Sequence, residues 1–476
     1  MKKIICLAVF AGLGFSGVAQ DKSVEFKPAE KHKFVGWEHT SNGLFYIVTG
    51  KAKSDVTINS YDADLNLAYE KNIETSYKGL SGSFGGGMND LPEYYDLYAS
   101  KTGQYAVSYE DRLIIDRSGK TTKLNYVHED ESGEIHSYFT FYSDDYMCYL
   151  GKKPSTGRGK NKIDDPNIYL FRRSISDQST KLITLPIPEI ATDEEKLKFG
   201  LHSYTKDGFY IVNKQLDKVN AVDIYNILNY NYDGQLISSK QLDVRLNGKY
   251  FAASNCGFGS STIIYSQNTT THRLSDNATG NIYIDQEKQV YYVFGVYTNS
   301  KDTNLYNSKN NGFYVKKFSF DGQLIWDSEN EINDKDYNKN AVSFHTQLSF
   351  FKLNDGKLGI RISNSKHHYA HMFLLNELNG EVLKNKKTEF DVSVIKLNGI
   401  RGGSFPTGYS NKTDFGGNSL NVDTFFAAFA SDKVDAFFKS VKDRKNNYNA
   451  FVLENGIYVL EENPDKDLFR LMKFNW

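Results

Sequence analysis

The sequence has few cysteines, few prolines and no excess of charge of either sign. Its 476 residues include 3 cysteines and 8 prolines, and the formal net charge is −1. A chain this close to neutral lacks the basic surface that binds nucleic acid or an anionic membrane, so we expect neither as a partner. Cys6 lies in the N-terminal segment described next. Cys148 and Cys256 lie in the rest of the chain, either as one disulfide or as two inert thiols.

Long apolar runs are also absent. The run at 4–15 follows two lysines and precedes the small residues Gly17 and Ala19. It is shorter than the roughly 20 apolar residues that a membrane-spanning helix needs, and its flanks are typical of a secretory signal peptide cleaved near Ala19. We therefore predict a signal peptide at 1–20, a mature domain at 21–476 with no transmembrane segment, and a periplasmic or extracellular location.

Aromatic residues and glycine, in contrast, are abundant, with 33 tyrosines, 32 phenylalanines and 37 glycines. This composition favours strands and tight turns over helices. Residues 229–237 read NYNYDGQLI and residues 317–325 read KFSFDGQLI. Each run has the pattern of a strand that ends in an aromatic residue, reverses at Asp-Gly and continues as a second strand. The chain therefore repeats one hairpin.

Similar turns recur along the whole chain. Their markers are Asp64, Ser118, Asp177, Asp233, Asp321, Asn379 and Asp465. Four of the six separations lie between 54 and 59 residues, and the other two are 88 and 86 residues. We interpret this as a degenerate repeat with insertions near 246–280 and 393–447. In the second insertion, Ser431 or Asp432 is placed to cap a helix with Val434 and Phe437 on one face.

The rhythm of these hairpins and the two DGQLI turns resemble the β-propeller superfamily over nearly all of the mature length. The resemblance implies an all-β fold of about seven four-stranded blades, with six to eight as the range, in one domain. Neither a WD dipeptide nor a kelch double glycine recurs from blade to blade. No family within the superfamily is indicated, so no functional residue is transferred from it.

Three residues are candidates for ligand contact. Arg401 and Phe405 lie in the glycine-rich stretch 398–408, where they could hold an anionic or sugar ligand at the rim of the propeller, although the stretch also fits an inter-blade loop. Trp37 is the third candidate, with packing in the core as the alternative.

The stretch 127–136, VHEDESGEIH, suggests a metal site. A hairpin centred on Ser132 would place His128, Asp130, Glu134 and His136 on one face, where they could bind a divalent metal. The alternative is a hairpin tip whose charges face water. Apart from this metal we expect no cofactor. His367 and His371 cannot share an ion in a strand, because four residues span about 13 Å.

These observations favour a secreted binding or scaffold protein that presents rim loops to a protein or glycan partner, and we expect a monomer. The alternative is a carbohydrate-active hydrolase or lyase with carboxylates in the propeller channel. An outer-membrane barrel is a third interpretation, suggested by the aromatic C-terminal run LFRLMKFNW. No pattern indicates a catalytic nucleophile, so no catalytic residue is assigned.

Overall fold

The computed structural model describes most of the chain from Gln20 to Trp476. The residues outside this description are 1–19, 41, 52–53, 76–94, 96, 109–110, 126–134, 154–155, 157–166, 189–198, 218–219, 253–254, 259–279, 302–308, 335–336, 338–345, 354, 365–368, 390–421, 442–445, 464–465 and 467. Removal of the signal peptide therefore stays a prediction. In the part of the chain that is described, no helix has the length and apolarity needed to cross a bilayer.

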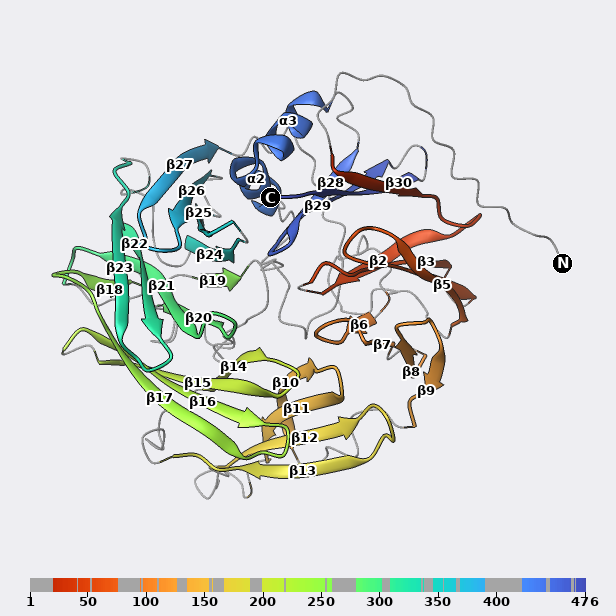
Figure 1. Ribbon diagram of the computed structural model, residues 1–476, viewed down its shortest axis with the longest axis horizontal. Coiled ribbons are helices and arrows are strands. Elements are labelled where there is room, and N and C mark those ends of the chain that lie inside the picture. The colour runs from red at the N-terminus through yellow and green to blue at the C-terminus, as the bar shows by residue number, and fades with distance from the viewer. Residues whose placement is uncertain are drawn as a thin grey trace.

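The described strands form seven sheets arranged around a central axis, as Figure 1 shows. This confirms the predicted all-β propeller of about seven four-stranded blades. In blades 1 to 4 the strands follow one another from the axis outward and pair antiparallel. These blades consist of β2 (Lys33–His39), β3 (Phe45–Lys51), β4 (Asp55–Tyr61) and β5 (Leu67–Glu74); β6 (Leu97–Ala99), β7 (Tyr105–Ser108), β8 (Leu113–Asp116) and β9 (Thr121–Lys123); β10 (His136–Tyr142), β11 (Tyr146–Lys152), β12 (Ile168–Ser174) and β13 (Thr180–Leu185); and β14 (Phe199–Tyr204), β15 (Gly208–Asp217), β16 (Val222–Asn231) and β17 (Leu236–Arg245).

Blades 5 and 6 each have a fifth strand, and blade 7 takes its fourth strand from the N-terminal end of the chain. They contain β18 (Tyr250–Ala252), β20 (Gly280–Asp285), β21 (Val290–Thr298), β22 (Gly312–Ser319) and β23 (Leu324–Glu331); β19 (Asn255–Phe258), β24 (Thr346–Lys352), β25 (Lys357–Asn364), β26 (Tyr369–Asn376) and β27 (Val382–Glu389); and β28 (Asn447–Leu453), β29 (Gly456–Asn463), β30 (Leu468–Phe474) and β1 (Lys22–Phe26). In blade 5 both β18 and β20 pair with β21, and in blade 6 β19 pairs in parallel with β24. The N-terminal strand β1 is the outermost strand of blade 7, so the two ends of the chain close the ring.

The two repeated nine-residue runs form the same hairpin in blades 4 and 5, as the sequence predicts. Gly234 and Gly322 occupy equivalent turn positions with φ values of 77° and 85°, a region that glycine adopts without steric cost. In both hairpins the register shifts by one residue beside the turn. A Cβ atom on Gly234 would lie 2.4 Å from Cγ2 of Ile183 in blade 3, so glycine also lets this turn pack closely on the preceding blade.

Side-chain oxygens hold several of these outer turns in shape. Asp62, Asp116 and Asn231 stand at the head of the turn in blades 1, 2 and 4. In each case Oδ1 accepts hydrogen bonds from two backbone N–H groups within the turn, at 2.8 to 3.0 Å. Such Asx turns satisfy backbone donors that the strands leave unpaired, which explains why Asp and Asn recur at these positions.

The last turn marker differs from the other six. Asp64, for example, lies between the third and fourth strands of its blade. Asp465 itself lies outside the described residues, but the flanking strands β29 and β30 are the second and third strands of blade 7. The prediction that all seven markers stand between equivalent strands is therefore wrong for the last of them. The physical reason is that β1, from the other end of the chain, provides the fourth strand of this blade.

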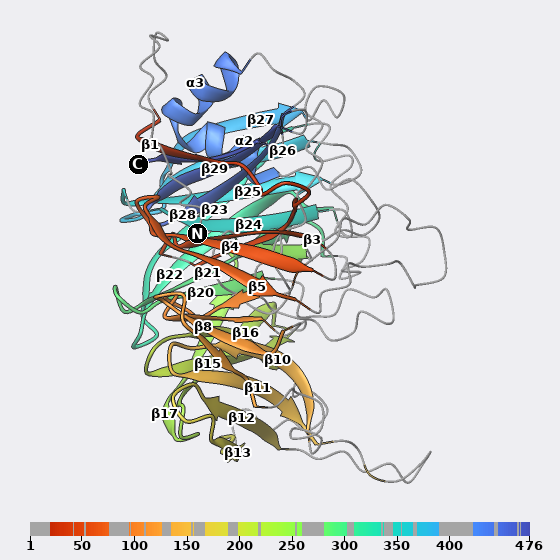
Figure 2. The ribbon, with the colours of Figure 1, turned by 90° about the vertical axis from the view of Figure 1, so that its right-hand side faces the viewer.

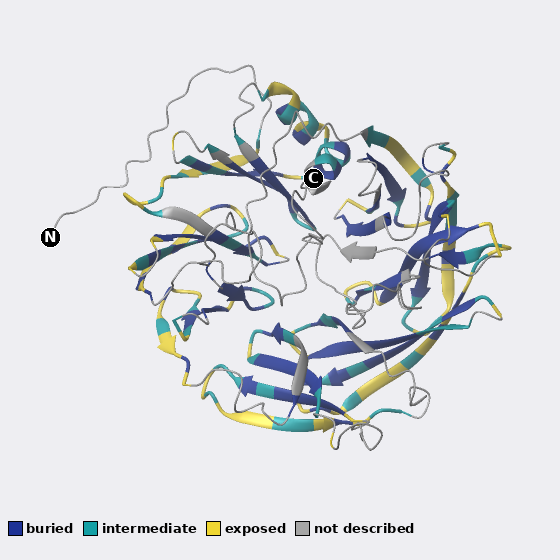
Figure 3. Cartoon of the chain, turned by 180° about the vertical axis from the view of Figure 1, so that it is seen from behind, coloured by how far each residue is buried: buried dark blue, intermediate teal, exposed yellow. Residues whose placement is uncertain are grey.

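Every junction between neighbouring blades has its own buried apolar cluster. At the junction of blades 1 and 2, for example, Tyr46, Ile58 and Ile115 pack together, and all three are nearly inaccessible. Figure 3 shows that burial concentrates on the inner strands and decreases toward the outermost strand of each blade. An isolated blade would expose both faces, so packing around the complete ring stabilises each sheet.

Two helices lie between blades 6 and 7, namely α2 (Val422–Ala430) and α3 (Asp432–Ser440). The structure confirms the predicted helix: Ser431 is the N-cap of α3, although its side chain makes no capping hydrogen bond, and Val434 and Phe437 are buried. Helix α2 was not predicted from the sequence. Its Phe426 stacks on Phe351 of blade 6 with ring centroids 4.0 Å apart, and both helices share one apolar cluster with blades 6 and 7.

The antiparallel order gives the ring two different faces. Turns between the first and second and between the third and fourth strands lie at one end of the strands, which we call the lower face. They are short, with at most five residues between strands, as at 40–44 and 62–66. The opposite, upper face carries the other connections, which include the long ones from β17 to β20 and from β27 to β28. Figure 2 shows the ring from its side.

Candidate functional site

Of the three predicted ligand-contacting residues, the structure describes only Trp37. Its ring packs edge to face on Phe451 of blade 7 at 4.6 Å between centroids and stacks on His39 at 5.5 Å. Trp37 therefore contributes to packing between blades 7 and 1. Arg401 and Phe405 lie outside the described residues, so the structure does not place them relative to Trp37.

Three of the four predicted metal ligands, His128, Asp130 and Glu134, also lie outside the described residues. His136 is the first residue of β10, where its backbone pairs with Lys152. The stretch 127–136 thus leads from blade 2 into the inner strand of blade 3. Within the described part of the chain, no three His, Cys, Asp or Glu side chains are grouped to hold a metal ion.

Side chains from several blades meet at the lower end of the central axis. The hydroxyl group of Tyr283, on β20 of blade 5, donates a hydrogen bond of 2.8 Å to Oε1 of Glu454 in the first turn of blade 7. This contact passes over the end of blade 6. It fixes the positions of two blades that are not neighbours in the ring.

Lys101, in the first turn of blade 2, extends across the same end of the axis. Its Nζ lies 5.1 Å from the centre of the Tyr204 ring in blade 4, a cation–π contact. Burial lowers the pKa of Lys101, while attraction to Glu454 and Asp144 opposes this effect. Asp144 in turn accepts hydrogen bonds from Ser100 and Thr102, which join blade 3 to blade 2.

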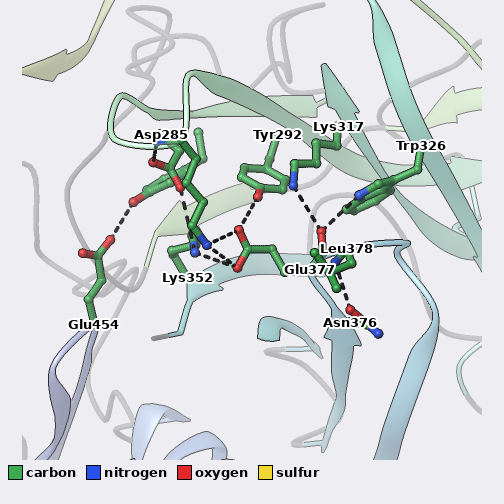
Figure 4. Close-up of polar contacts among 11 residues, drawn as sticks. Asp285, Tyr292, Lys317, Trp326, Lys352, Asn376, Glu377, Leu378 and Glu454 are labelled. Atoms are coloured by element: carbon green, nitrogen blue, oxygen red, sulfur yellow. Dashed lines mark hydrogen bonds and ion pairs between the residues drawn. The ribbon is translucent and has the colours of Figure 1, made fainter. Parts of the chain in front are cut away.

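A group of charged side chains lies between blades 5 and 6 on the lower face (Figure 4). The Glu377 carboxylate, in the turn after β26, accepts hydrogen bonds from Nζ of Lys288 at 2.6 and 2.7 Å, Nζ of Lys352 at 3.0 Å and the hydroxyl of Tyr292 at 2.8 Å. The Glu377 backbone carbonyl accepts hydrogen bonds from Trp326 at 3.1 Å and from Lys317 at 3.3 Å. One turn of blade 6 is thereby attached to three strands of its neighbour.

The protonation state of Glu377 follows from these contacts. Its side chain is only 3% exposed, and burial opposes ionisation. The hydrogen bonds from Lys288, Lys352 and Tyr292 outweigh burial and lower the pKa of Glu377 to about 2. The carboxylate therefore stays ionised at neutral pH and acts as a charged anchor between blades.

The inner edge of blade 6 carries a parallel strand, whereas the other strand pairs of the described part of the ring are antiparallel. Strand β19 extends from the insertion near 246–280 and runs beside β24, on the side nearer the axis (Figure 1). A stretch of the insertion thus occupies space close to the axis.

The carboxyl groups with a clearly shifted pKa, in the part of the chain that the structure describes, are ionised at neutral pH. A glycosidase needs one carboxyl group whose pKa is raised so that it can donate a proton at neutral pH. The described carboxyl groups whose pKa departs clearly from the ordinary value all have a lowered pKa, namely Asp21, Asp55, Asp62, Asp116, Asp177, Glu329 and Glu377. These groups are acceptors and anchors at neutral pH.

Comparison with known proteins identifies no family. No protein-family model matches the chain, and no curated protein matches its sequence. Solved structures with similar folds include an uncharacterised protein from Listeria monocytogenes EGD-e, at 10% identity and a TM-score of 0.34 over 74% of this chain and 81% of that one. A quinoprotein alcohol dehydrogenase-like protein from Bacteroides thetaiotaomicron gives 13% identity and a TM-score of 0.30 over 75% and 66% of the two chains. The Dos1 propeller gives 10% identity and a TM-score of 0.31 over 78% of each chain. Similarity at this level says nothing of activity.

Proposed function

We propose that the protein is a secreted binding protein that presents the upper face of its propeller to a protein or glycan partner, in the periplasm or outside the cell. The signal-peptide pattern supports the location. The difference between the two faces supports the mode of binding.

One observation carries this proposal. Side chains from blades that are not neighbours contact one another at the lower end of the axis, as Tyr283 does with Glu454 and Lys101 with Tyr204. The lower face is otherwise built from turns of at most five residues, whereas the long connections begin and end at the upper face. Binding residues are concentrated in loops that a rigid scaffold positions, and among the connections between described strands the long ones join strand ends at the upper face.

The proposal is tested with variants of the two faces, screened on an array of glycans and on an array of peptides. The upper-face variant changes two connections whose flanking strands begin or end at the upper face. Residues 79–91, between β5 and β6, are replaced by a Gly-Ser linker of the same length, and Arg401→Ala and Phe405→Ala are introduced between β27 and β28. The matched lower-face variant carries Lys206→Ala and Asp207→Ala, in an exposed short turn. We expect the wild-type and lower-face proteins to bind the same ligands and the upper-face variant to lose them. Binding that is lost only in the lower-face variant, or hydrolysis of an arrayed glycan, would contradict the proposal.

A further inference from the structure

The innermost strand of blade 5 is interrupted along its length. Strand β18 pairs with the upper end of β21 and ends at Ala252, which stands opposite Val296. Strand β20 pairs with the rest of β21 and begins at Gly280, which stands opposite Gly295. Val296 and Gly295 are consecutive residues of β21. Ala252 and Gly280 therefore occupy consecutive positions of one continuous line of strand, although residues 253–279 lie between them in the sequence.

The interrupting segment 253–279 contains one described strand, β19, which lies on the next blade. Residues Asn255–Phe258 pair in parallel with residues 347–350 of β24, the innermost strand of blade 6, on the side nearer the axis (Figure 1). In the other blades, as far as their strands are described, the innermost strand ends its sheet and carries no further strand toward the axis. Blade 6 therefore shows that the inner edge of a blade accepts an added strand.

The attachment of β19 to blade 6 is limited. Its ladder with β24 covers four residue pairs, whereas β24 and β25 share seven. Parallel pairing is slightly less stable per residue than antiparallel pairing, and Gly257 in the middle of β19 weakens the strand further. Because β18 and β20 form one line along β21, blade 5 would keep its innermost strand if β19 left blade 6.

The side chains of β24 define what an added strand meets. Leu348 and Phe350 are 0% and 1% exposed and belong to the apolar cluster between blades 5 and 6. Ser349 lies between them on the other face of the sheet, where it accepts a hydrogen bond of 2.8 Å from Nη2 of Arg361. An added strand therefore fits best with apolar residues in register with Leu348 and Phe350 and a small residue in register with Ser349. The sequence of β19, NCGF, has this pattern at these positions.

The inner edge of β24 is approached from the upper face. β24 runs from the upper end of blade 6 toward the lower end, because the turn that follows it, 353–356, lies on the lower face. The hydrogen bond between Tyr283 and Glu454 passes over the lower end of blade 6. The edge that accepts β19 therefore belongs to the side of the ring on which binding is proposed.

We propose that the inner edge of β24 is a strand-addition site for an extended segment of a protein partner, and that β19 occupies this site until the partner binds. Main-chain hydrogen bonds supply the affinity of such a complex, and apolar residues at alternate positions supply its selectivity. This inference rests on the proposed function and specifies the partner as a protein. A glycan partner is the alternative outcome of the test.

The test uses a variant in which residues 253–279 are deleted and Ala252 is joined directly to Gly280, as the register on β21 allows. The matched control keeps 253–258 and replaces 259–279 with a Gly-Ser linker of the same length, so that β19 is retained. The probe is a fluorescein-labelled synthetic peptide of residues 253–260, kept reduced. Fluorescence anisotropy measures its binding, and thermal unfolding measures the stability of each protein.

We expect the deletion variant to bind the peptide saturably and to keep an unfolding midpoint close to that of the wild type. The wild-type protein and the linker control should bind at least about tenfold more weakly, because a site that is free a tenth of the time loses that factor in affinity. The same peptide with Cys256→Asp and Phe258→Asp should not bind, since it places charges beside the apolar cluster. Equal binding of the two peptides would overturn the inference.

A second variant covers the case in which the deletion disturbs the ring. The full chain with Cys256→Asp and Phe258→Asp keeps its length, disfavours docking of β19 and should bind the unmodified peptide as the deletion variant does. Absence of peptide binding to both variants, or an unfolding midpoint that falls strongly in both, would overturn the inference. If the arrays yield glycans that the upper-face variant no longer binds, while no protein binds the peptide, the proposed function stands without strand addition.

Discussion

The Glu377 carboxylate and the Lys288 ammonium group form an ion pair across the junction of blades 6 and 5, with N–O distances of 2.6 and 2.7 Å. The glutamate is almost fully buried, while the lysine side chain is 49% exposed. Lys352 binds the same carboxylate from the buried side. The buried Glu377 carboxylate therefore contacts two cations, of which Lys288 is partly exposed to solvent and Lys352 is buried.

Replacement of Glu377 by Gln should destabilise the protein strongly. The substitution leaves the buried ammonium group of Lys352 without its main counter-ion, a change that typically costs about 3 kcal/mol or more. Urea denaturation followed by tryptophan fluorescence measures the effect. The matched control is Asp355→Asn, which removes an ion pair with Lys357 in a partly exposed turn and should cost less than about 1 kcal/mol. Equal effects of the two substitutions would contradict the assigned role of Glu377.

Acid should remove the contribution of Glu377 in a defined range of pH. The pKa of this group is lowered in the folded state from 4.5 to about 2. A lowered carboxyl pKa stabilises the fold at pH values above the unfolded pKa, and this stabilisation is lost as pH falls through the folded pKa. Wild-type stability should therefore decrease from about pH 4.5 to about pH 2 more steeply than that of Glu377→Gln. Parallel curves for the two proteins would count against the lowered pKa.

Cys148 should be inert in the native protein. Its thiol is free and fully buried in the cluster between blades 3 and 4, and burial raises its pKa. Of the two states that the sequence allows, the structure thus has Cys148 reduced. In a Cys256→Ser variant, iodoacetamide followed by mass spectrometry should label Cys148 only after denaturation. Rapid labelling of the native variant would show that this junction opens.

Strand β1 should be needed to close the ring. It pairs with β30 over five residues, and Phe26 stacks on Phe469 with ring centroids 5.3 Å apart. A chain that begins at residue 27 should unfold several kcal/mol more easily, because it loses this ladder and exposes the edge of blade 7. A synthetic peptide of residues 20–27 should restore the unfolding midpoint, and the same peptide with Val24 and Phe26 replaced by Ser should not. An unchanged midpoint in the truncated chain would contradict closure by β1.

The blades were predictable because their signals are local. Gly234 and Gly322 follow Asp in hairpins whose strands lie a few residues away, so composition and spacing suffice to locate them. The position of β30 as the third strand of its blade was not predictable in this way, since the fourth strand is β1, from the opposite end of the chain. Helix α2 was missed because its sequence, VDTFFAAFA, is almost uniformly apolar and has no polar face to reveal a helical period.

The polar clusters could not be predicted from the sequence, for the same physical reason. Glu377 lies 89 residues from Lys288 and 25 from Lys352, and none of these residues stands in a pattern that marks its partners. His371 was noted only as part of a histidine-rich run, and its neighbour Tyr337 comes from the adjacent blade connection. Closure of the ring creates these contacts, so only the three-dimensional arrangement reveals them.

Binding at the upper face is tested by amide hydrogen exchange with and without the tightest-binding ligand from the glycan and peptide arrays. We expect slower exchange on binding at the upper strand ends, at 310–313, 332–334 and 369–372, and unchanged exchange in the lower turns at 100–104 and 205–207. Protection confined to the lower turns, with unchanged exchange at the upper strand ends, would show that the ligand binds the other face.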